Sequence, residues 1–231
     1  MAGQLALYAA ATGGSLLVGA ALGSFRTPPR TLTAGMLAFA SGALIVAVAF
    51  ELFEPAHHKA GLTRASIALV LGATTFIAVD LVLTRKAGSG AVGLALVAAA
   101  TLDGVSENFA LGVTVVGGGS LALLASIVTS NLPESFGGAA EMRHSGMSRV
   151  RVLTVWAVTA ALLVVALVAG RFAADVTSEQ SLGMLSAFAA GAVLASVADS
   201  LMPEAYAEGG PLVAFATSAG FLVAYALTTV D

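Results

Sequence analysis

Residues 102–109 read Leu-Asp-Gly-Val-Ser-Glu-Asn-Phe and lie inside an apolar run from 91 to 116. Residues 129–136 read Thr-Ser-Asn-Leu-Pro-Glu-Ser-Phe and lie inside a second apolar run, from 120 to 143. Each run has the length of a transmembrane helix, which needs about 20 mostly apolar residues. We therefore expect two consecutive membrane helices that carry carboxylates near the middle of the bilayer.

The composition of the whole chain also favours a membrane protein. Hydrophobic residues make up 58% of the 231 residues and charged residues only 10%, whereas a soluble domain has about 25% charged residues. So few charges could not cover the surface of a soluble protein, so lipid is the natural solvent for this chain. The absence of cysteine excludes disulfides and thiolate metal sites.

Eight apolar runs reach spanning length, and turn or charge signals such as Pro28-Pro29-Arg30, three glycines at 117–119 and Gly209-Gly210-Pro211 separate them. The predicted spans are 4–23, 31–54, 65–84, 91–116, 120–143, 151–170, 182–206 and 211–229. Backbone groups in lipid must be hydrogen-bonded within their own segment, so the spans are helices. We expect an all-α membrane protein whose residues 1–231 form a single transmembrane transport domain.

The basic residues predict the orientation. With the N-terminus outside, the inner loops hold seven Lys or Arg and the outer side holds three. The inner residues are Arg26, Arg30, Arg85, Lys86, Arg143, Arg149 and Arg151, and the outer ones are Lys59, Arg64 and Arg171. The positive-inside rule then places both termini outside. The short loops favour a prokaryotic plasma (inner) membrane.

Two spans of opposite direction resemble each other. Residues 35–56 contain Gly-Met-Leu, Phe-Ala-Ser-Gly-Ala and Glu-Pro-Ala, and residues 183–205 contain Gly-Met-Leu, Phe-Ala-Ala-Gly-Ala and Pro-Glu-Ala, with a one-residue gap. Such similarity is typical of an inverted-topology repeat. It predicts a 3+2+3 arrangement with spans four and five in the centre; the alternative is chance similarity between Ala- and Gly-rich helices.

Carboxylates lie inside the apolar runs. At least seven are found there: Glu51, Glu54, Asp80, Asp103, Glu107, Glu134 and Asp199. A charge at a helix centre costs at least about 2.5–3.5 kcal/mol on insertion scales. No Lys or Arg lies deep in these spans to pair with them, so protons or bound metal ions remain as partners.

The sharpest cluster combines spans four and five. Asp103 and Glu107 are four residues apart and share one helix face, and Ser130 and Glu134 have the same spacing at about the same depth. Pro133 removes one backbone hydrogen bond and crowds the carbonyl four residues earlier, which can then face a cavity. The pattern predicts a cation site of oxygen ligands, although Ser and Asn in membranes also serve as interhelical hydrogen-bond donors and Pro as a simple kink.

These residues resemble the ZIP (Zrt/Irt-like) family of zinc and iron transporters. The resemblance rests on Asp103-Gly-Val-Ser-Glu-Asn-Phe-Ala-Leu-Gly, on Asn131-Leu-Pro-Glu-Ser-Phe-Gly and on Phe50-Glu-Leu-Phe-Glu-Pro-Ala in span two. Eight spans with both termini outside and a 3+2+3 inverted repeat also fit that family. Asp103 stands where the family has His, and Gly104 stands where it has Asn.

The resemblance implies a binuclear metal centre between spans four and five. Glu107 and Glu134 would bridge the ions, Asp103 and Ser130 would complete one site, and Asn131 would serve the second. The further carboxylate candidates are Glu51 and Asp199. Glu54, His57 and His58 at the outer mouth would capture an incoming ion; the alternative for the His pair is a solvated loop end.

The resemblance implies transport of divalent cations toward the cytoplasm by alternating access, with Zn²⁺ as the first expectation and Fe²⁺, Mn²⁺ and Cd²⁺ as further cargoes. Ligand oxygens also suit Mn²⁺, Mg²⁺ or Ca²⁺. The expected partners are metal ions, the bilayer and a second copy in a homodimer; no basic patch predicts nucleic-acid binding.

An enzyme is not expected, because the chain has no hydrolytic motif such as His-Glu-x-x-His. The alternative function is a cation- or proton-coupled transporter of a small organic solute. It would need a polar or aromatic pocket, yet the chain has one Trp and three Tyr.

Overall fold

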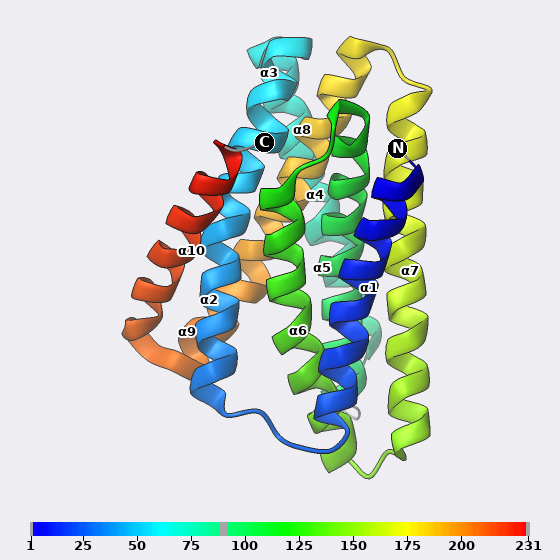
Figure 1. Cartoon of the computed structure of the whole chain (residues 1–231), viewed down its shortest axis with the longest axis vertical. Helices are drawn as coiled ribbons and strands as arrows, with labels where there is room; N and C mark the ends of the chain where they lie inside the picture. The colour runs from blue at the N-terminus through cyan, green and yellow to red at the C-terminus, as the bar shows by residue number, and fades with distance from the viewer. Residues whose placement is uncertain (1, 88–91, 230–231) are drawn as a thin grey trace.

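In this computed structural model, which describes residues 2–87 and 92–229, all regular secondary structure is helical (Figure 1). The α-helices are α1 (Ala2–Gly23), α2 (Arg30–Ala47), α3 (Glu54–Ala60), α4 (Leu62–Ala87), α5 (Val92–Thr114), α6 (Leu121–His144), α7 (Arg149–Asp175), α8 (Glu179–Ser196), α9 (Met202–Gly209) and α10 (Val213–Thr228). Two π-helical segments, η1 (Val48–Phe53) and η3 (Val197–Leu201), and two 3₁₀ segments, η2 (Val115–Gly117) and η4 (Gly210–Leu212), join them.

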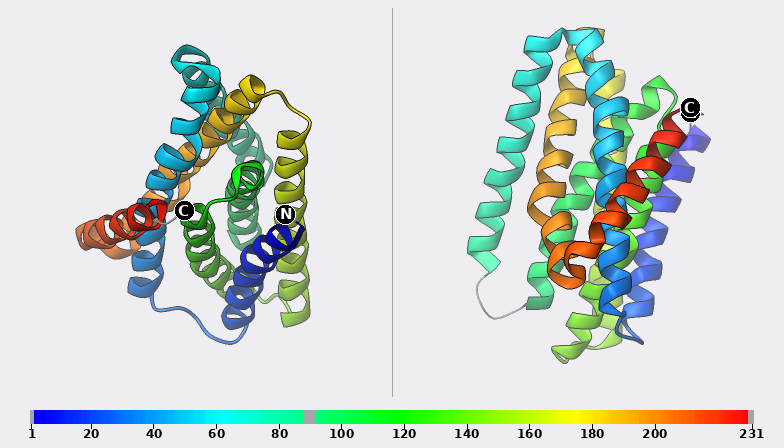
Figure 2. Two further views of the ribbon diagram at one scale, coloured as in Figure 1. Left: turned by 45° about the horizontal axis from the view of Figure 1, so that its top comes forward. Right: turned by 90° about the vertical axis from the view of Figure 1, so that its left-hand side faces the viewer.

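The long helices form an elongated bundle with α5 and α6 on the inside (Figure 2). Helix α5 packs against α6, α7 and α8, and α6 packs against α1 and α2 as well as α5. Helices α4 and α10 lie at the outside, against α8 and α2 respectively. Both chain ends lie toward the end that carries α3, while the loop between α1 and α2 lies at the opposite end (Figure 1).

Three helix pairs are held by the same reciprocal contact. In each pair, a Cβ atom added to a glycine of either helix would lie only 1.9–2.1 Å from a backbone oxygen of the other helix. The glycines are Gly42 and Gly220 for α2 with α10, Gly72 and Gly191 for α4 with α8, and Gly112 and Gly170 for α5 with α7. Small residues let membrane helices approach closely, so these glycines set the spacing of the pairs.

The two π-helical segments each precede a proline. Pro55 and Pro203 stand at the start of α3 and α9, and a proline lacks an N–H and crowds the carbonyl four residues earlier. The helix continues by changing register: the Glu54 N–H donates to Ala49 O and the Met202 N–H to Val197 O, each five residues back. The predicted second span, 31–54, therefore extends as one helical run to Ala60.

The predicted number of eight separate spans is wrong in one place. In the described residues the helical segments form seven uninterrupted runs, because spans 182–206 and 211–229 are joined through η4 without a non-helical residue. Pro211 is tolerated in the first turn of a helical segment, and Gly210 reverses the chain with φ 63°. The break at 117–119 is confirmed, since Gly118 and Gly119 adopt φ of 113° and 90° there.

Five of these runs are long and apolar enough to cross a membrane. They are Gly3–Gly23, Arg30–Ala60, Leu62–Val82, Arg149–Asp175 and Glu179–Thr228. Helices α5 and α6 fall outside this set among the described residues, and they are the helices whose apolar runs contain Asp103, Glu107 and Glu134. The all-α architecture with several membrane-length apolar helices is thus as expected.

Candidate cation site

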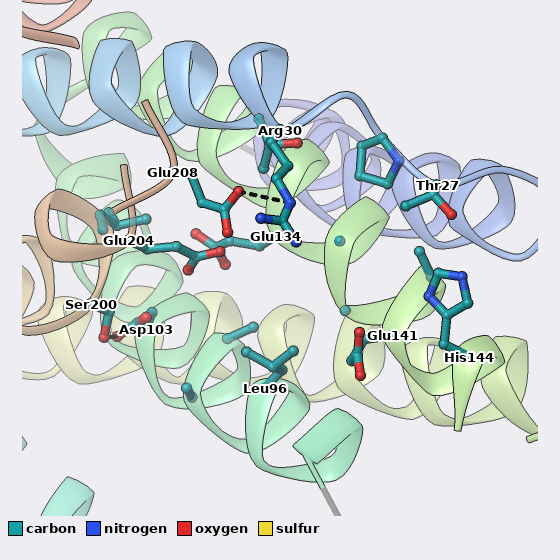
Figure 3. Close-up of a pocket in the computed structure, with 18 residues that line it drawn as sticks. Thr27, Arg30, Leu96, Asp103, Glu134, Glu141, His144, Ser200, Glu204 and Glu208 are labelled. Atoms are coloured by element: carbon teal, nitrogen blue, oxygen red, sulfur yellow. Dashed lines mark hydrogen bonds and ion pairs between the residues drawn. The ribbon is translucent and has the colours of Figure 1, made fainter. Parts of the chain in front are cut away.

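A cavity of about 290 Å³ lies between α2, α5, α6, η3 and α9. Its inner end is formed by Asp103 and Ser200, and it extends to Thr27 and Pro28 in the loop between α1 and α2 and to His144 at the end of α6 (Figure 3). The cavity therefore runs from the middle of α5 toward the end of the bundle opposite α3.

Asp103 lies near the middle of α5 and is 3% exposed. Its Oδ1 atom accepts hydrogen bonds from Ser196 Oγ at 2.8 Å and from Ser200 Oγ at 3.4 Å. Both serines come from the chain of α8 and η3, so a third helix reaches the predicted pair of spans four and five. The carboxylate thus has one oxygen fixed by hydroxyl groups while the residue lines the cavity.

Glu107 follows one turn later on α5 and is 1% exposed. Ser130 Oγ, on α6, lies 3.4 Å from Glu107 Oε2 and 3.1 Å from the carbonyl of Ile127. One hydroxyl proton serves only one strong bond, so Glu107 shares this donor with the backbone. The other oxygen, Oε1, is buried without a hydrogen-bond partner among the described residues.

Glu134 lies on α6 directly after Pro133, which stands inside an unbroken helix. The residue is half-buried and lines the cavity, and its Oε1 is buried without a hydrogen-bond partner in the part of the chain that the structure describes. In Figure 3 its carboxylate groups with those of Glu204 and Glu208. Spans four and five therefore bring Asp103 and Glu134 to one cavity, with Glu107 behind its wall.

The cavity lining is strongly acidic. Five carboxylates line it, from Asp103, Glu134, Glu141, Glu204 and Glu208. Against them stand His144 and Arg30, whose Nε lies 3.6 Å from Glu208 Oε2. A cleft with charges of one sign and low-dielectric walls concentrates ions of the opposite sign, so this cavity attracts cations.

Asn131 and Glu51 lie away from this cavity. The Asn131 side chain is fully buried and its Nδ2 donates to the carbonyl of Thr12 on α1 at 3.2 Å. Its Oδ1 has no hydrogen-bond partner within residues 2–87 and 92–229. Glu51 is half-buried in η1 and is not among the residues that line the cavity.

The remaining predicted residues are exposed or at the far end of the bundle. Asp199 is exposed on η3. Glu54, His57 and His58 lie on α3, away from the cavity, and the two histidine rings contact each other with centroids 5.0 Å apart. The structure thus places Glu54, His57 and His58 far from the inner end of the cavity, whereas Asp199 is next in sequence to Ser200, which lines it.

Two carboxylates of the cavity, one arginine and one pair of serine donors were missed from the sequence. Glu204 and Glu208 line the cavity from α9, Arg30 pairs with Glu208, and Ser196 and Ser200 hold Asp103. The i,i+4 spacing of the two serines and of the two glutamates was available in the sequence, but exposed and buried faces of such a helix cannot be told apart by spacing.

The carboxylates of Asp103 and Glu107 are each hydrogen-bonded to serine hydroxyl groups. Across residues 2–87 and 92–229, no three His, Cys, Asp or Glu side chains lie close enough together to hold a metal ion. A cation at Asp103 or Glu107 would draw further oxygens from Ser196, Ser200, Ser130, the backbone or water. Hard divalent cations accept such mixed oxygen ligands.

No protein-family model matches the chain, and no curated protein matches its sequence.

Proposed function

We propose that this protein carries divalent metal cations across a membrane by way of the carboxylates of Asp103, Glu107 and Glu134, with serine, backbone or water oxygens as the remaining ligands. The observation that carries this proposal is an excess of buried acceptors. Of five buried side-chain N or O atoms without a hydrogen-bond partner in the described residues, four are oxygens on α5 and α6. They belong to Glu107, Asn108, Asn131 and Glu134.

A buried polar atom without a partner costs about 1–3 kcal/mol, and more when it is charged. Unmatched acceptors can be satisfied only by donors or by cations. Glu134 lines the acidic cavity, so a hydrated cation has a path to it, and Glu107 lies one helical turn from Asp103, which lines the same cavity. Protons can occupy the same carboxylates when no metal is bound, which allows exchange between the two.

A one-sided cavity favours a carrier over an open channel. Beyond Glu107 and Ser130, toward the turn at Gly118, α5 and α6 are packed into a buried apolar cluster that includes Leu111, Leu123 and Ile127. This cluster separates the site from the end that carries α3, while the cavity leads to the other end. Alternating access would open the apolar side when the acidic side closes.

The ZIP-like arrangement with a 3+2+3 inverted repeat is part of this proposal. It is supported by the π-helical segments η1 and η3, which follow similar sequences in α2 and α8 and precede a proline in both. It is also supported by the glycine contacts, because α2 packs on α10 through Gly42 and α8 packs on α4 through Gly191 in the same way. The reversal at Gly210 lets α10 return along α2.

The lining of the cavity favours an ion over an organic solute. Pockets for small organic ligands are lined mostly by apolar and aromatic side chains, whereas this cavity carries five carboxylates, Arg30 and His144. Zn²⁺ is the first cargo to test, with Fe²⁺, Mn²⁺ and Cd²⁺ next. We place both termini outside a prokaryotic plasma membrane, so that the cavity faces the cytoplasm, and we propose inward transport on the resemblance to ZIP transporters.

The test is uptake of Zn²⁺, Fe²⁺, Mn²⁺ and Cd²⁺ into proteoliposomes by the parent chain and by the double variant Glu107→Gln/Glu134→Gln. Glutamine keeps the side-chain volume and removes the charge. Glu179→Gln is the matched control, because Glu179 is exposed at the start of α8 and outside the cavity. We expect uptake by the parent and the control and none by the double variant. Equal uptake by the double variant, or none by the folded parent, would refute the proposal.

A further inference from the structure

Two serines from α8 and η3 reach across to Asp103. Ser196 and Ser200 are one turn apart, and both hydroxyls donate to the same atom, Asp103 Oδ1, at 2.8 and 3.4 Å. Ser196 is fully buried, whereas Ser200 is half-buried and lines the cavity. The shorter bond is thus the one shielded from water.

This arrangement differs from that of other buried serines in the bundle. Ser41 Oγ donates to Leu37 O and Ser126 Oγ donates to Ala122 O, each four residues back on its own helix. That is the usual bond of a serine inside a helix. Ser196 instead directs its hydroxyl to a carboxylate on another helix. A bond to a charged acceptor is roughly twice as strong as a neutral one, so it fixes both partners.

Ser200 occupies the same position after the close-packed glycine of its helix as Glu51 does in the other π-helical segment. Ser200 follows Gly191 by nine residues, and Glu51 follows Gly42 by nine residues. Both residues lie in a π-helical segment, η3 and η1. π-helical turns inside α-helices are frequent at functional sites. At this position η1 carries a carboxylate and η3 carries a hydroxyl.

We infer that Ser196 is a positioning residue that sets the cation affinity of the site by fixing one oxygen of Asp103. The inference rests on the proposed function. With Oδ1 held by Ser196, the Asp103 side chain is restricted to one orientation and its second oxygen is left for the ion. Ser200 contributes a weaker, cavity-facing bond that a cation can replace. The site is then built from three helices, α5, α6 and α8.

Zn²⁺ uptake kinetics test the role of Ser196. Loss of a hydrogen bond to a charged group should raise KM roughly tenfold or more, with the maximal rate little changed. We therefore expect this rise for Ser196→Ala, a smaller rise for Ser200→Ala and near-parent KM for Ser196→Thr, which keeps the hydroxyl. Ser126→Ala is the matched control, because that buried hydroxyl bonds only its own helix among the described residues. An unchanged KM for Ser196→Ala, or an equal rise for Ser126→Ala, overturns the inference.

A second readout does not depend on transport. The infrared carboxyl band of Asp103, identified by its loss in Asp103→Asn, should shift in Ser196→Ala and stay in place in Ser126→Ala. A parent chain that moves no Zn²⁺ refutes the proposed function, while the band still decides whether Ser196 holds Asp103. A band that does not move in Ser196→Ala overturns the inference whether or not Zn²⁺ is carried.

Discussion

Replacing Gly42 by alanine should separate α2 from α10. The added Cβ would lie 1.9 Å from the carbonyl oxygen of Thr217, and real Cβ contacts are essentially never shorter than 3.0 Å. The two backbones must then move apart by about 1.1 Å. At that separation each neighbouring contact loses about a quarter to a half of its dispersion energy. Overpacking lowers the free energy of unfolding by about 1–3 kcal/mol. The higher helix propensity of alanine raises it by up to about 1 kcal/mol. We expect the free energy of unfolding to fall by about 1–2 kcal/mol, because the atom that the new Cβ meets belongs to the backbone of α10 and not to a flexible side chain.

The free energy of unfolding, measured by titrating detergent micelles with a denaturing detergent, checks this expectation. Gly35→Ala is the matched control on the same helix, because a Cβ there meets no atom within 4 Å. The free energy of unfolding of Gly35→Ala should equal that of the parent chain or exceed it by up to about 1 kcal/mol. If Gly42→Ala is as stable as Gly35→Ala, the helices are not spaced by this contact, and the account of reciprocal glycine packing fails.

Three further changes address the cavity, the proline and the turn. Arg30→Gln removes a positive charge from the cavity lining, so the KM for cation uptake should fall at low salt and approach the parent value at high salt, when uptake is measured at both. Pro133→Ala restores a backbone donor for the Thr129 carbonyl, so the free energy of unfolding should rise while the uptake rate falls. Gly119→Ala should lower the free energy of unfolding by at least about 1 kcal/mol because its φ is 90°, whereas Gly117→Ala, with no atom near its Cβ, should have little effect.

The positions of the helices could be predicted from the sequence because membrane length imposes them. A run of about 20 apolar residues has to become a helix, and the runs at 120–143 and 65–84 correspond to α6 and α4 within a few residues. The junction at 209–211 could not be predicted in the same way. Glycine and proline end most helices, but Gly210 also permits a positive φ and Pro211 suits a first helical turn, so a 3₁₀ segment joins the runs.

In the candidate site, too, the features local to one helix could be predicted and the contacts between distant helices could not. The i,i+4 spacing of Asp103 with Glu107 predicts a shared face, and the depth of Glu134 predicts a common cavity wall, since both are local properties of a helix. The bond from Ser196 to Asp103 spans 93 residues of sequence. Serine is common in such helices and usually bonds its own backbone, so only the packing of α8 on α5 identifies it.

Close glycine contacts join the long helices in pairs, and Asp103 lies at the border between two of these pairs. Close glycine contacts join α1 with α6 and α5 with α7, and they join α2 with α10 and α4 with α8. The Ser130–Glu107 contact joins the pair α5–α7 to the pair α1–α6, and the bonds from Ser196 and Ser200 to Asp103 join α5–α7 to the chain of α8 and η3. Helices held backbone to backbone move together, so we expect alternating access to shift the pair α4–α8 against the pair α5–α7 and to break the Ser196 bond. The infrared band of Asp103 would report that break during turnover, and a band that stays fixed while Zn²⁺ is transported would exclude movement at this border.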